Sequence, residues 1–348
     1  MIARSERTRP VATIGSGRMR ALVTGGAGFI GSHLADRLVN DGHRVTVVDN
    51  ESTGRRSNVP RGARYLKGDV TCLDELEAVF AEGLDVVLHV VGQVSLIRSY
   101  ADPAFDLLTN VLGTINVLRF CLKHRVPRLL YASSMTVYGH AASLPTPEDT
   151  PCCPVSYYGI TKYAGERYVH TTAERVDLDF EFRVTSFRMY NVYGPRQALD
   201  NPYQGVLGIF LGNLLRGEPL TIFGDGEQSR DFVYIDDVVD AWAAAIDCWN
   251  TDGQAFNLGS GRRISINDLA DHVLAAFECT RLTHPVEYRP RRPGEQRHVE
   301  ADIARARFAL SWAPRTSFAE GLAKTALWAR QTFAEHNAGA TTAGRGVP

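Results

Sequence analysis

A glycine-rich turn near the start of the chain constrains the fold more than any other feature. The turn reads Thr24-Gly25-Gly26-Ala27-Gly28-Phe29-Ile30-Gly31; it follows the apolar run Ala21-Leu22-Val23 and opens an amphipathic run from Phe29 to Leu38. These patterns predict a buried strand, a tight turn and a helix. Glycines at such a junction let backbone amides approach a pyrophosphate at the helix N-terminus. We therefore expect Gly25, Gly28, Phe29, Ile30 and Gly31 to line a dinucleotide site.

Strand-like and helix-like segments alternate after this turn. Strands are predicted at residues 20–24, 45–48, 64–67, 85–90 and 128–132, with helical patterns between them. Such alternation predicts an α/β fold built on a Rossmann-type doubly wound parallel sheet. Ligands of these sheets bind at the carboxyl ends of the strands, so the residues found there are candidate site residues.

The 348 residues exceed the usual size of a single core, so we expect a second, smaller lobe at the C-terminal end. We assign residues 19–190 to the dinucleotide-binding Rossmann domain. Residues 191–335 are assigned mainly to a substrate-binding lobe, with part of 225–260 returning to the Rossmann domain. Residues 1–18 are rich in Arg, Ser and Gly and residues 336–348 in Ala, Gly and Thr, and we expect both to be disordered.

Acidic residues follow the second and third predicted strands. Asp49 stands roughly twenty residues past the glycines, where a carboxylate binds ribose hydroxyls and repels a 2′-phosphate. This position favours NAD over NADP, and we interpret Arg55 and Arg56 in the next loop as solvated charges. Asp69 can meet the adenine amino group. The apolar Val90 would let the cofactor lie close to the end of the fourth strand.

A tyrosine and a lysine four residues apart form the candidate catalytic pair. Tyr158 and Lys162 share one face of a predicted helix, and Ser134 follows the fifth strand. A phenol is a poor base at neutral pH, and a neighbouring cation lowers its pKa. We expect Lys162 to act on Tyr158 in this way, while the Ser134 hydroxyl holds the substrate oxygen that loses its proton. The pair alone is weak evidence, because both residue types decorate exposed helices, but the glycine turn upstream changes that balance.

Composition excludes several other classes. The net charge of −1 offers no basic field for nucleic acid or anionic lipid, and no apolar run approaches the length of a membrane span. We therefore expect a cytoplasmic protein with neither nucleic-acid nor membrane partners. The six cysteines lack zinc spacing and indicate reduced thiols rather than a metal site; Cys152 and Cys153 are adjacent, which we interpret as an accident of a loop.

The second half of the chain contains a further series of motifs. They are Phe187-Arg188-Met189-Tyr190-Asn191-Val192-Tyr193-Gly194-Pro195-Arg196, Leu220-Thr221-Ile222-Phe223-Gly224-Asp225-Gly226 and Ser229-Arg230-Asp231-Phe232-Val233-Tyr234. With the motifs above, and in the same order, they resemble the extended short-chain dehydrogenases/reductases of the NAD-dependent sugar-nucleotide epimerase/dehydratase family. The resemblance runs from about Met19 to about Arg330.

The resemblance implies a role for each matching residue. The cofactor would be NAD, held by the glycines, Asp49, Asn50, Asp69, Val70, Val90, Asn110, Tyr158 and Lys162. The substrate would be a nucleotide sugar. Its sugar and diphosphate would contact Ser134, Met135, Thr136, Asn191, Val206, Arg230, Arg292 and Val299, and its nucleobase would lie on Thr221 and Phe223.

The segment after Ser134 discriminates between the reactions of the family. Dehydratases carry an Asp-Glu pair there and decarboxylases usually a glutamate, whereas this chain has Met135 and Thr136, which supply no acid or base. Simple 4-epimerases carry Ser-Ser-Ala-Thr-Val-Tyr-Gly, which differs from this chain only at Met135. The resemblance is therefore strongest to UDP-hexose 4-epimerases. The alternatives are a UDP-glucuronate 4-epimerase, an NDP-hexose 4-ketoreductase, and a non-catalytic NAD(P)-binding sensor.

Two further expectations concern the substrate and the assembly. Val299 matches the gate beside the sugar C2 substituent, where tyrosine excludes N-acetyl groups, so UDP-GlcNAc and UDP-GalNAc are expected beside UDP-glucose and UDP-galactose. Family members usually form homodimers through helices near residues 102–124 and 156–174. Val111, Ile115, Leu118 and Leu122 are compatible with such an interface or equally with the core.

Overall fold

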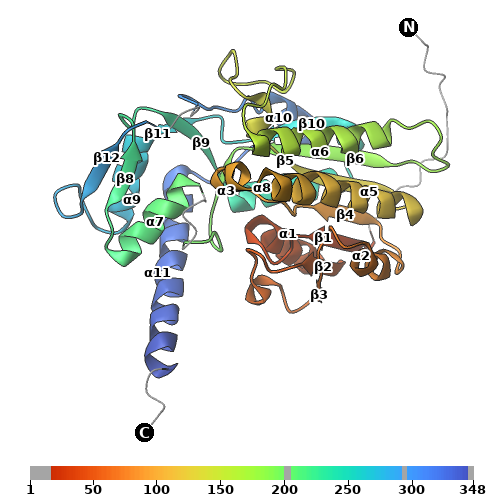
Figure 1. The fold of residues 1–348 in the computed structure, drawn as a ribbon, viewed down its shortest axis with the longest axis horizontal. Coiled ribbons are helices and arrows are strands. Elements are labelled where there is room, and N and C mark those ends of the chain that lie inside the picture. Colours follow the sequence, from red (N-terminus) through yellow and green to blue (C-terminus); the bar gives the residue numbers. More distant parts are fainter. Residues whose placement is uncertain (1–16, 200–204, 292–295, 344–348) are drawn as a thin grey trace.

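A parallel sheet of seven strands forms the centre of the molecule in the computed structural model, which describes residues 17–199, 205–291 and 296–343 (Figure 1). The strand order is β10-β6-β5-β4-β1-β2-β3, and all neighbouring pairs run parallel. This confirms the predicted Rossmann-type sheet. The strands are β1 (Arg20–Thr24), β2 (Arg44–Asp49), β3 (Arg64–Lys67), β4 (Val86–His89), β5 (Arg128–Ser134), β6 (Arg183–Met189) and β10 (Gln254–Leu258).

Successive residues of the central strands face two separate cores. Leu130 and Ala132 of β5 pack with α1 (Phe29–Asn40) and α8 (Ile235–Ile246). Leu129 and Tyr131 pack on the other side, and the helices there are α2 (Leu73–Phe80), α5 (Gly113–Lys123) and α6 (Tyr157–Ala173). Because both faces are covered, β5 is buried over its whole length, as strands of doubly wound sheets are.

One covering helix is unusually long and apolar. A short helix, α3 (Leu96–Ala101), precedes α4 (Pro103–Leu107), and a π-helical turn at Leu108–Leu112 joins α4 to α5. The resulting helix, Pro103–Lys123, is the one helix of the described residues whose length and composition would allow it to cross a membrane. This corrects our expectation that no apolar segment reaches that length. Here 56% of its most apolar window is buried inside the protein.

A smaller lobe lies beside the carboxyl-terminal edge of the large sheet (Figure 1). It contains a three-stranded sheet, β11-β9-β7, and a parallel pair, β8 with β12. Its strands are β7 (Asn191–Tyr193), β8 (Leu220–Phe223), β9 (Ser229–Tyr234), β11 (Arg263–Ser265) and β12 (Val286–Arg289); its main helices are α7 (Val206–Arg216) and α9 (Ile266–Ala276).

The remaining elements connect and flank the two lobes. They are α10 (Ala304–Leu310), α11 (Phe318–Ala343) and the 3-10 turns Arg56–Asn58, Met135–Tyr138 and Trp249–Thr251. The last part of α11 extends away from the lobes (Figure 1) and includes residues 336–343, which the sequence assigned to a disordered tail. Alanine-rich sequence favours helix, which accounts for this difference. Residues 1–16, expected to be a disordered extension, lie outside the described part.

Candidate active site

The glycine turn joins β1 to α1 and presents its backbone at the carboxyl edge of the sheet. Gly25 has a φ of +71°, and a Cβ there would lie 2.8 Å from the Cα of Val91 at the end of β4. A Cβ at Gly31 would clash with the Gly25 carbonyl oxygen. Gly28 is the N-cap of α1, and Phe29 and Ile30 form its first turn. Glycine at 25 and 31 therefore permits this close packing of the turn, and the start of α1 beyond it is a place where a pyrophosphate would fit.

Polar side chains at the ends of β2 and β3 extend this cradle. Asp49 ends β2, is buried, and accepts hydrogen bonds from the amides of Ala27 (3.0 Å) and Glu51 (2.7 Å). Burial raises the pKa of Asp49, and these hydrogen bonds oppose that effect. Asn50 donates to Asp69 (2.7 Å), and Val70 is buried beside it. These residues surround the edge where NAD's adenosine half would lie.

The predicted catalytic residues lie on two neighbouring elements. Ser134 is the last residue of β5, and its Oγ accepts hydrogen bonds from the backbone and hydroxyl of Thr136. Tyr158 and Lys162 lie in the first two turns of α6, which begins after the Ser156 cap. The Ser134 hydroxyl favours the ionised form of the Tyr158 phenol, which indicates that the two groups are close. The Lys162 ammonium lies over the ring of Tyr131, 4.5 Å from its centroid.

Burial dominates the protonation of both groups. It raises the pKa of Tyr158 to about 12, although the Ser134 hydroxyl acts in the opposite direction. We expected Lys162 to lower this pKa below its ordinary value, and that expectation is wrong for the protein alone, because burial outweighs the stabilisation of phenolate. Burial also lowers the pKa of Lys162 to about 8, so its charge is held less firmly than that of a surface lysine.

Asn110 belongs to a polar cluster that the sequence did not predict. Its side chain is buried in the π-helical turn, accepts from the Gln93 amide (2.8 Å), and donates to Asp106 (2.9 Å) and Thr161 (3.1 Å). Asn110 was expected to contact the cofactor, but these internal bonds occupy its side chain. The available signal was a carboxylate placed four residues before an asparagine within an apolar helix.

Glu166 and Arg188 form a buried ion pair next to the catalytic residues. Glu166, one turn after Lys162, accepts from Ser133 (2.6 Å) and forms an ion pair with Arg188 at 2.6 Å. Arg188 also donates to Tyr138 (3.0 Å) and to the Glu148 carbonyl (3.0 Å). This network ties β5, β6 and α6 together at Ser133, the residue before Ser134.

Two predicted substrate residues line one cavity. The cavity has a volume of about 220 Å³ and lies between the turn after β5 and the segment at residues 296–299. Met135 and Val299 both contribute to its wall, together with Tyr190 and His298. Val299 is 5% exposed and brings a small apolar side chain to this surface. Thr136 follows Met135 in the same turn.

The other predicted substrate residues come from the smaller lobe. Asn191 on β7 donates to the Asp231 carbonyl (3.0 Å), and Arg230 on β9 donates to the Ser229 carbonyl (2.9 Å). Val206 starts α7, and Thr221 and Phe223 are half-buried on β8. Arg292 lies outside the described residues. The structure thus leaves the predicted diphosphate and nucleobase contacts as expectations.

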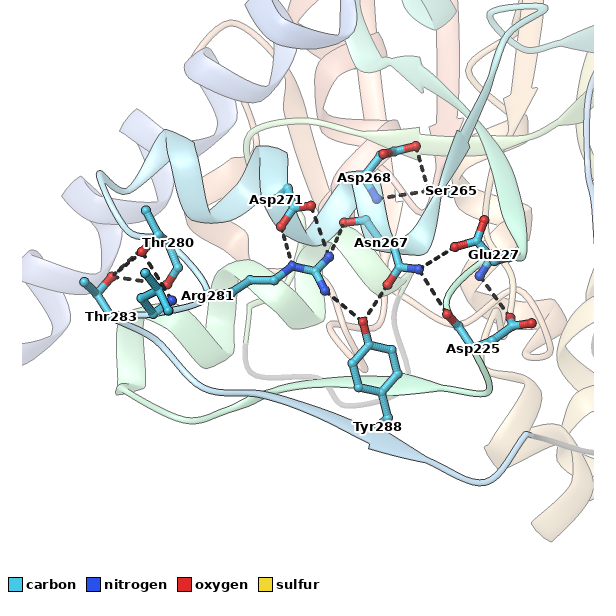
Figure 2. A network of polar contacts seen from close by, with 11 residues as sticks. Asp225, Glu227, Ser265, Asn267, Asp268, Asp271, Thr280, Arg281, Thr283 and Tyr288 are labelled. Atoms are coloured by element: carbon cyan, nitrogen blue, oxygen red, sulfur yellow. Dashed lines mark hydrogen bonds and ion pairs between the residues drawn. The ribbon is translucent and has the colours of Figure 1, made fainter.

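A hydrogen-bond network fixes the turn that follows β8 (Figure 2). Asn267, in the first turn of α9, donates to the Asp225 carbonyl (3.0 Å) and to Glu227 (2.8 Å). Tyr288 of β12 donates to Asn267 (2.8 Å) and accepts from Arg281 (2.8 Å). The network holds β8, with Thr221 and Phe223, against the rest of the lobe.

The seven-stranded sheet, the glycine turn and the group of Ser134, Tyr158 and Lys162 together define an NAD-dependent enzyme of the short-chain dehydrogenase/reductase type. In agreement, residues 21–259 match the NAD dependent epimerase/dehydratase family. The chain belongs to this family. No group of three or more histidine, cysteine, aspartate or glutamate side chains suited to a metal occurs in the described part of the chain. Cys152 and Cys153 are free thiols.

Curated relatives and solved structures cover almost all of the chain. A UDP-glucose 4-epimerase of Mycolicibacterium smegmatis is 40% identical over 88% of this chain and 97% of its own. A solved UDP-glucose 4-epimerase of Thermotoga maritima with UDP-glucose has a TM-score of 0.85 and 38% identity, covering 90% of this chain and 99% of that one. UDP-glucuronic acid decarboxylase 1 of Arabidopsis thaliana is 32% identical over 89% of this chain and 69% of its own. The family therefore includes similar proteins with two different reactions.

Proposed function

We propose that the enzyme inverts C4 of a nucleotide sugar through a transient 4-keto sugar. The observation that carries the proposal is the placement of Ser134 at the end of β5 and of Tyr158 at the start of α6, beside a turn whose first residues are Met135 and Thr136. A phenol and a hydroxyl suffice to move the proton of a sugar hydroxyl, while the neighbouring thioether and threonine supply neither acid nor base. The similarity to UDP-glucose 4-epimerases supports the same reaction.

The chain's own residues handle one proton and one oxygen. Tyr158, as phenolate, accepts the proton of the 4-hydroxyl and later returns it; Ser134 donates a hydrogen bond to that oxygen. Lys162 places a positive charge beside Tyr158 and favours the phenolate form. NAD, when bound, supplies the redox chemistry at C4 in both directions, so substrate and product have the same oxidation state.

The decarboxylase reaction is the runner-up, because four relatives with 32–34% identity are UDP-glucuronic acid decarboxylases. Loss of carbon dioxide from a keto-uronate is usually accompanied in this family by a glutamate before Val-Tyr-Gly, and Thr136 stands in that place. A 4-ketoreductase would release its cofactor after each turnover. Bound NAD that survives purification would favour the epimerase over the reductase.

A substrate panel in D2O tests the reaction. We expect proton NMR to show a C4-inverted product of unchanged mass, with no deuterium on carbon, from UDP- or dTDP-hexoses. Loss of water or of carbon dioxide, or deuterium on carbon, would contradict the proposal. Inversion of UDP-glucuronate alone would transfer it to uronic-acid epimerisation.

The cavity beside Met135 and Val299 bears on the substrate. Because Val299 is small and faces this cavity, we propose that UDP-GlcNAc and UDP-GalNAc are accepted along with UDP-glucose and UDP-galactose. Val299→Tyr fills the space and should reduce turnover of the N-acetyl sugars with little change for UDP-glucose. Equal effects on both sugar classes would count against this assignment.

An exposed apolar face suggests how two copies associate. Leu107, Leu108 and Leu112 on the long helix, with Ile160 and Tyr168 on α6, are 39–53% exposed. Val111 and Leu118, two of the four residues considered for the interface, instead belong to the core. We propose a homodimer through this face, in a cytoplasmic enzyme. Light scattering should give twice the chain mass for the native protein and the monomer mass for Leu108→Glu.

A further inference from the structure

The carboxylate of Asp106 is one of the most deeply buried charges of the protein, with an exposure of 0%. One oxygen accepts from Gln93 (3.1 Å) and Asn110 (2.9 Å), and the other from Ser99 (2.8 Å) and Thr161 (3.1 Å). All of these donors are neutral amides or hydroxyls. Burying a charge without a cation is costly, so a carboxylate kept in this place indicates a role beyond packing.

Lys162 is a buried cation that directly follows Thr161, one of the donors to Asp106, in the chain. The two are linked through Gly92 as well: a Cβ at Gly92 would lie 3.0 Å from Asn110 Oδ1 and 3.6 Å from Lys162 Nζ. Asn110, bonded to Asp106, and the ammonium therefore flank the same backbone atom at the end of β4. Asp106 favours the charged form of Lys162, and it also raises the pKa of Tyr158, so its direct effect on the phenol is opposite to the effect of the ammonium.

The other groups that face Lys162 do not replace Asp106 as its counter-ion. Tyr131 on β5 offers only its ring. His89 on β4 is buried, hydrogen bonds with Thr24 and Thr114, and has its pKa lowered to about 3 by burial and by Lys162. Glu166 on α6 also favours the charged lysine, but it already has Arg188 as a direct partner.

We propose that Asp106 is a positioning residue of the active site, the counter-ion that keeps Lys162 protonated and holds Asn110 and Thr161 in place around it. Its benefit is a full positive charge beside Tyr158 at neutral pH. The expected effect on turnover rests on the proposed function. The expected effect on the titration of Lys162 does not, because it can be measured without substrate.

The scarcity of lysine makes that titration measurable. Lysine occurs only at Lys67, Lys123, Lys162 and Lys324. Incorporation of lysine labelled with carbon-13 at Cε gives one signal for each, and Lys162→Arg assigns the buried one. In Asp106→Asn the midpoint of the Lys162 titration should fall by roughly one pH unit, the low end of the effect of a neighbouring charge. The other three signals should not move.

Asp102→Asn is the matched control, because it removes the same charge from the exposed cap of the same helix. We expect no shift of Lys162 in that variant. An unchanged midpoint in Asp106→Asn, or an equal shift in Asp102→Asn, would overturn the proposal. If the asparagine variant does not fold, Asp106→Ser removes the charge while its hydroxyl still accepts hydrogen bonds, and the same outcomes apply.

Turnover supplies a second readout. The alkaline limb of the pH–rate profile should shift downward by the same amount in Asp106→Asn, and the rate at pH 8 should fall several-fold, without a matching change in Asp102→Asn. A shifted titration with an unshifted profile would refute the positioning role. Absence of epimerase activity in the native enzyme would instead refute the proposed function and leave the titration result intact.

Discussion

Two buried cations pack against β5, one at its first residue and one on the helix that follows its carboxyl end, and their surroundings differ. Arg128, the first residue of β5, donates to Asp252 (2.7 Å), Thr185 (2.8 Å), Thr251 (2.9 Å) and the Ala245 carbonyl (2.6 Å). Lys162 lies over the ring of Tyr131, and the carboxylates that act on it, Asp106 and Glu166, form no direct ion pair with it. The charge of Arg128 is therefore paired directly with a carboxylate, whereas Lys162 has no carboxylate within ion-pair distance among the described residues.

The pKa values express the same contrast. Burial lowers the pKa of both groups, to about 10 for Arg128 and to about 8 for Lys162. Arg128 therefore keeps its charge throughout the physiological range and serves the fold. Lys162 lies close to its titration range, as groups at active sites often do.

The largest effect is expected at the catalytic end. Tyr158→Phe removes the proton acceptor without changing the shape of the helix, so kcat should fall by roughly 10²–10⁴-fold with little change in the unfolding midpoint. Tyr157→Phe, its exposed neighbour on α6, is the control and should retain native turnover. Activity in Tyr158→Phe within a few-fold of native would transfer the acid–base role to another group.

The opposite end of β5 should respond in stability and not in chemistry. Arg128→Met leaves Thr185, Thr251 and the Ala245 carbonyl without their donor, and we expect a loss of about 3 kcal/mol in the free energy of unfolding by urea. Arg175→Met, which breaks an exposed ion pair with Asp177, should leave the midpoint unchanged. A loss of kcat per folded molecule in Arg128→Met would show that the two ends are not independent.

Sequence could predict proximity only for residues whose positions depend on the local geometry of one helix or one strand. Tyr158 and Lys162 share a helix face, and Ser134 ends a strand whose neighbours end at the same edge. Repeated strand and helix patterns therefore sufficed to predict the sheet and these positions. For the helix face at the expected interface, sequence left interface and core equally open, and the structure places Val111 and Leu118 in the core while Leu108 and Leu112 are exposed.

Contacts between distant segments and the effects of burial could not be predicted in the same way. Asp106 meets Thr161 across 55 residues, a contact that depends on how the long helix packs against α6. The direction of the Tyr158 pKa was also missed, because it depends on the exposure of the phenol and not on the spacing of the lysine. Sequence shows which groups are present, while packing decides how strongly each is charged.

The smallest expected effect is the change in the free energy of unfolding when Lys162 is replaced, and its sign is informative. The pKa of Lys162 is about 8 in the folded protein and about 10.5 when unfolded, so below pH 8 both states bind the proton and the fold bears the cost of burying the charge. Between the two values the unfolded state binds more protons, and this cost disappears as pH rises. Lys162→Met should therefore abolish most activity but increase stability by about 1–3 kcal/mol at pH 7.

This gain should shrink above pH 8 and vanish beyond pH 10.5. Lys123→Met, at an exposed helix position paired with Glu77, should give no such gain at any pH, which makes it the matched control. Urea unfolding of both variants across this range measures the difference. If Lys162→Met destabilises the protein at pH 7, then Asp106, Glu166 and the Tyr131 ring compensate the buried ammonium more fully than its lowered pKa indicates, and the contrast with Arg128 would be one of degree only.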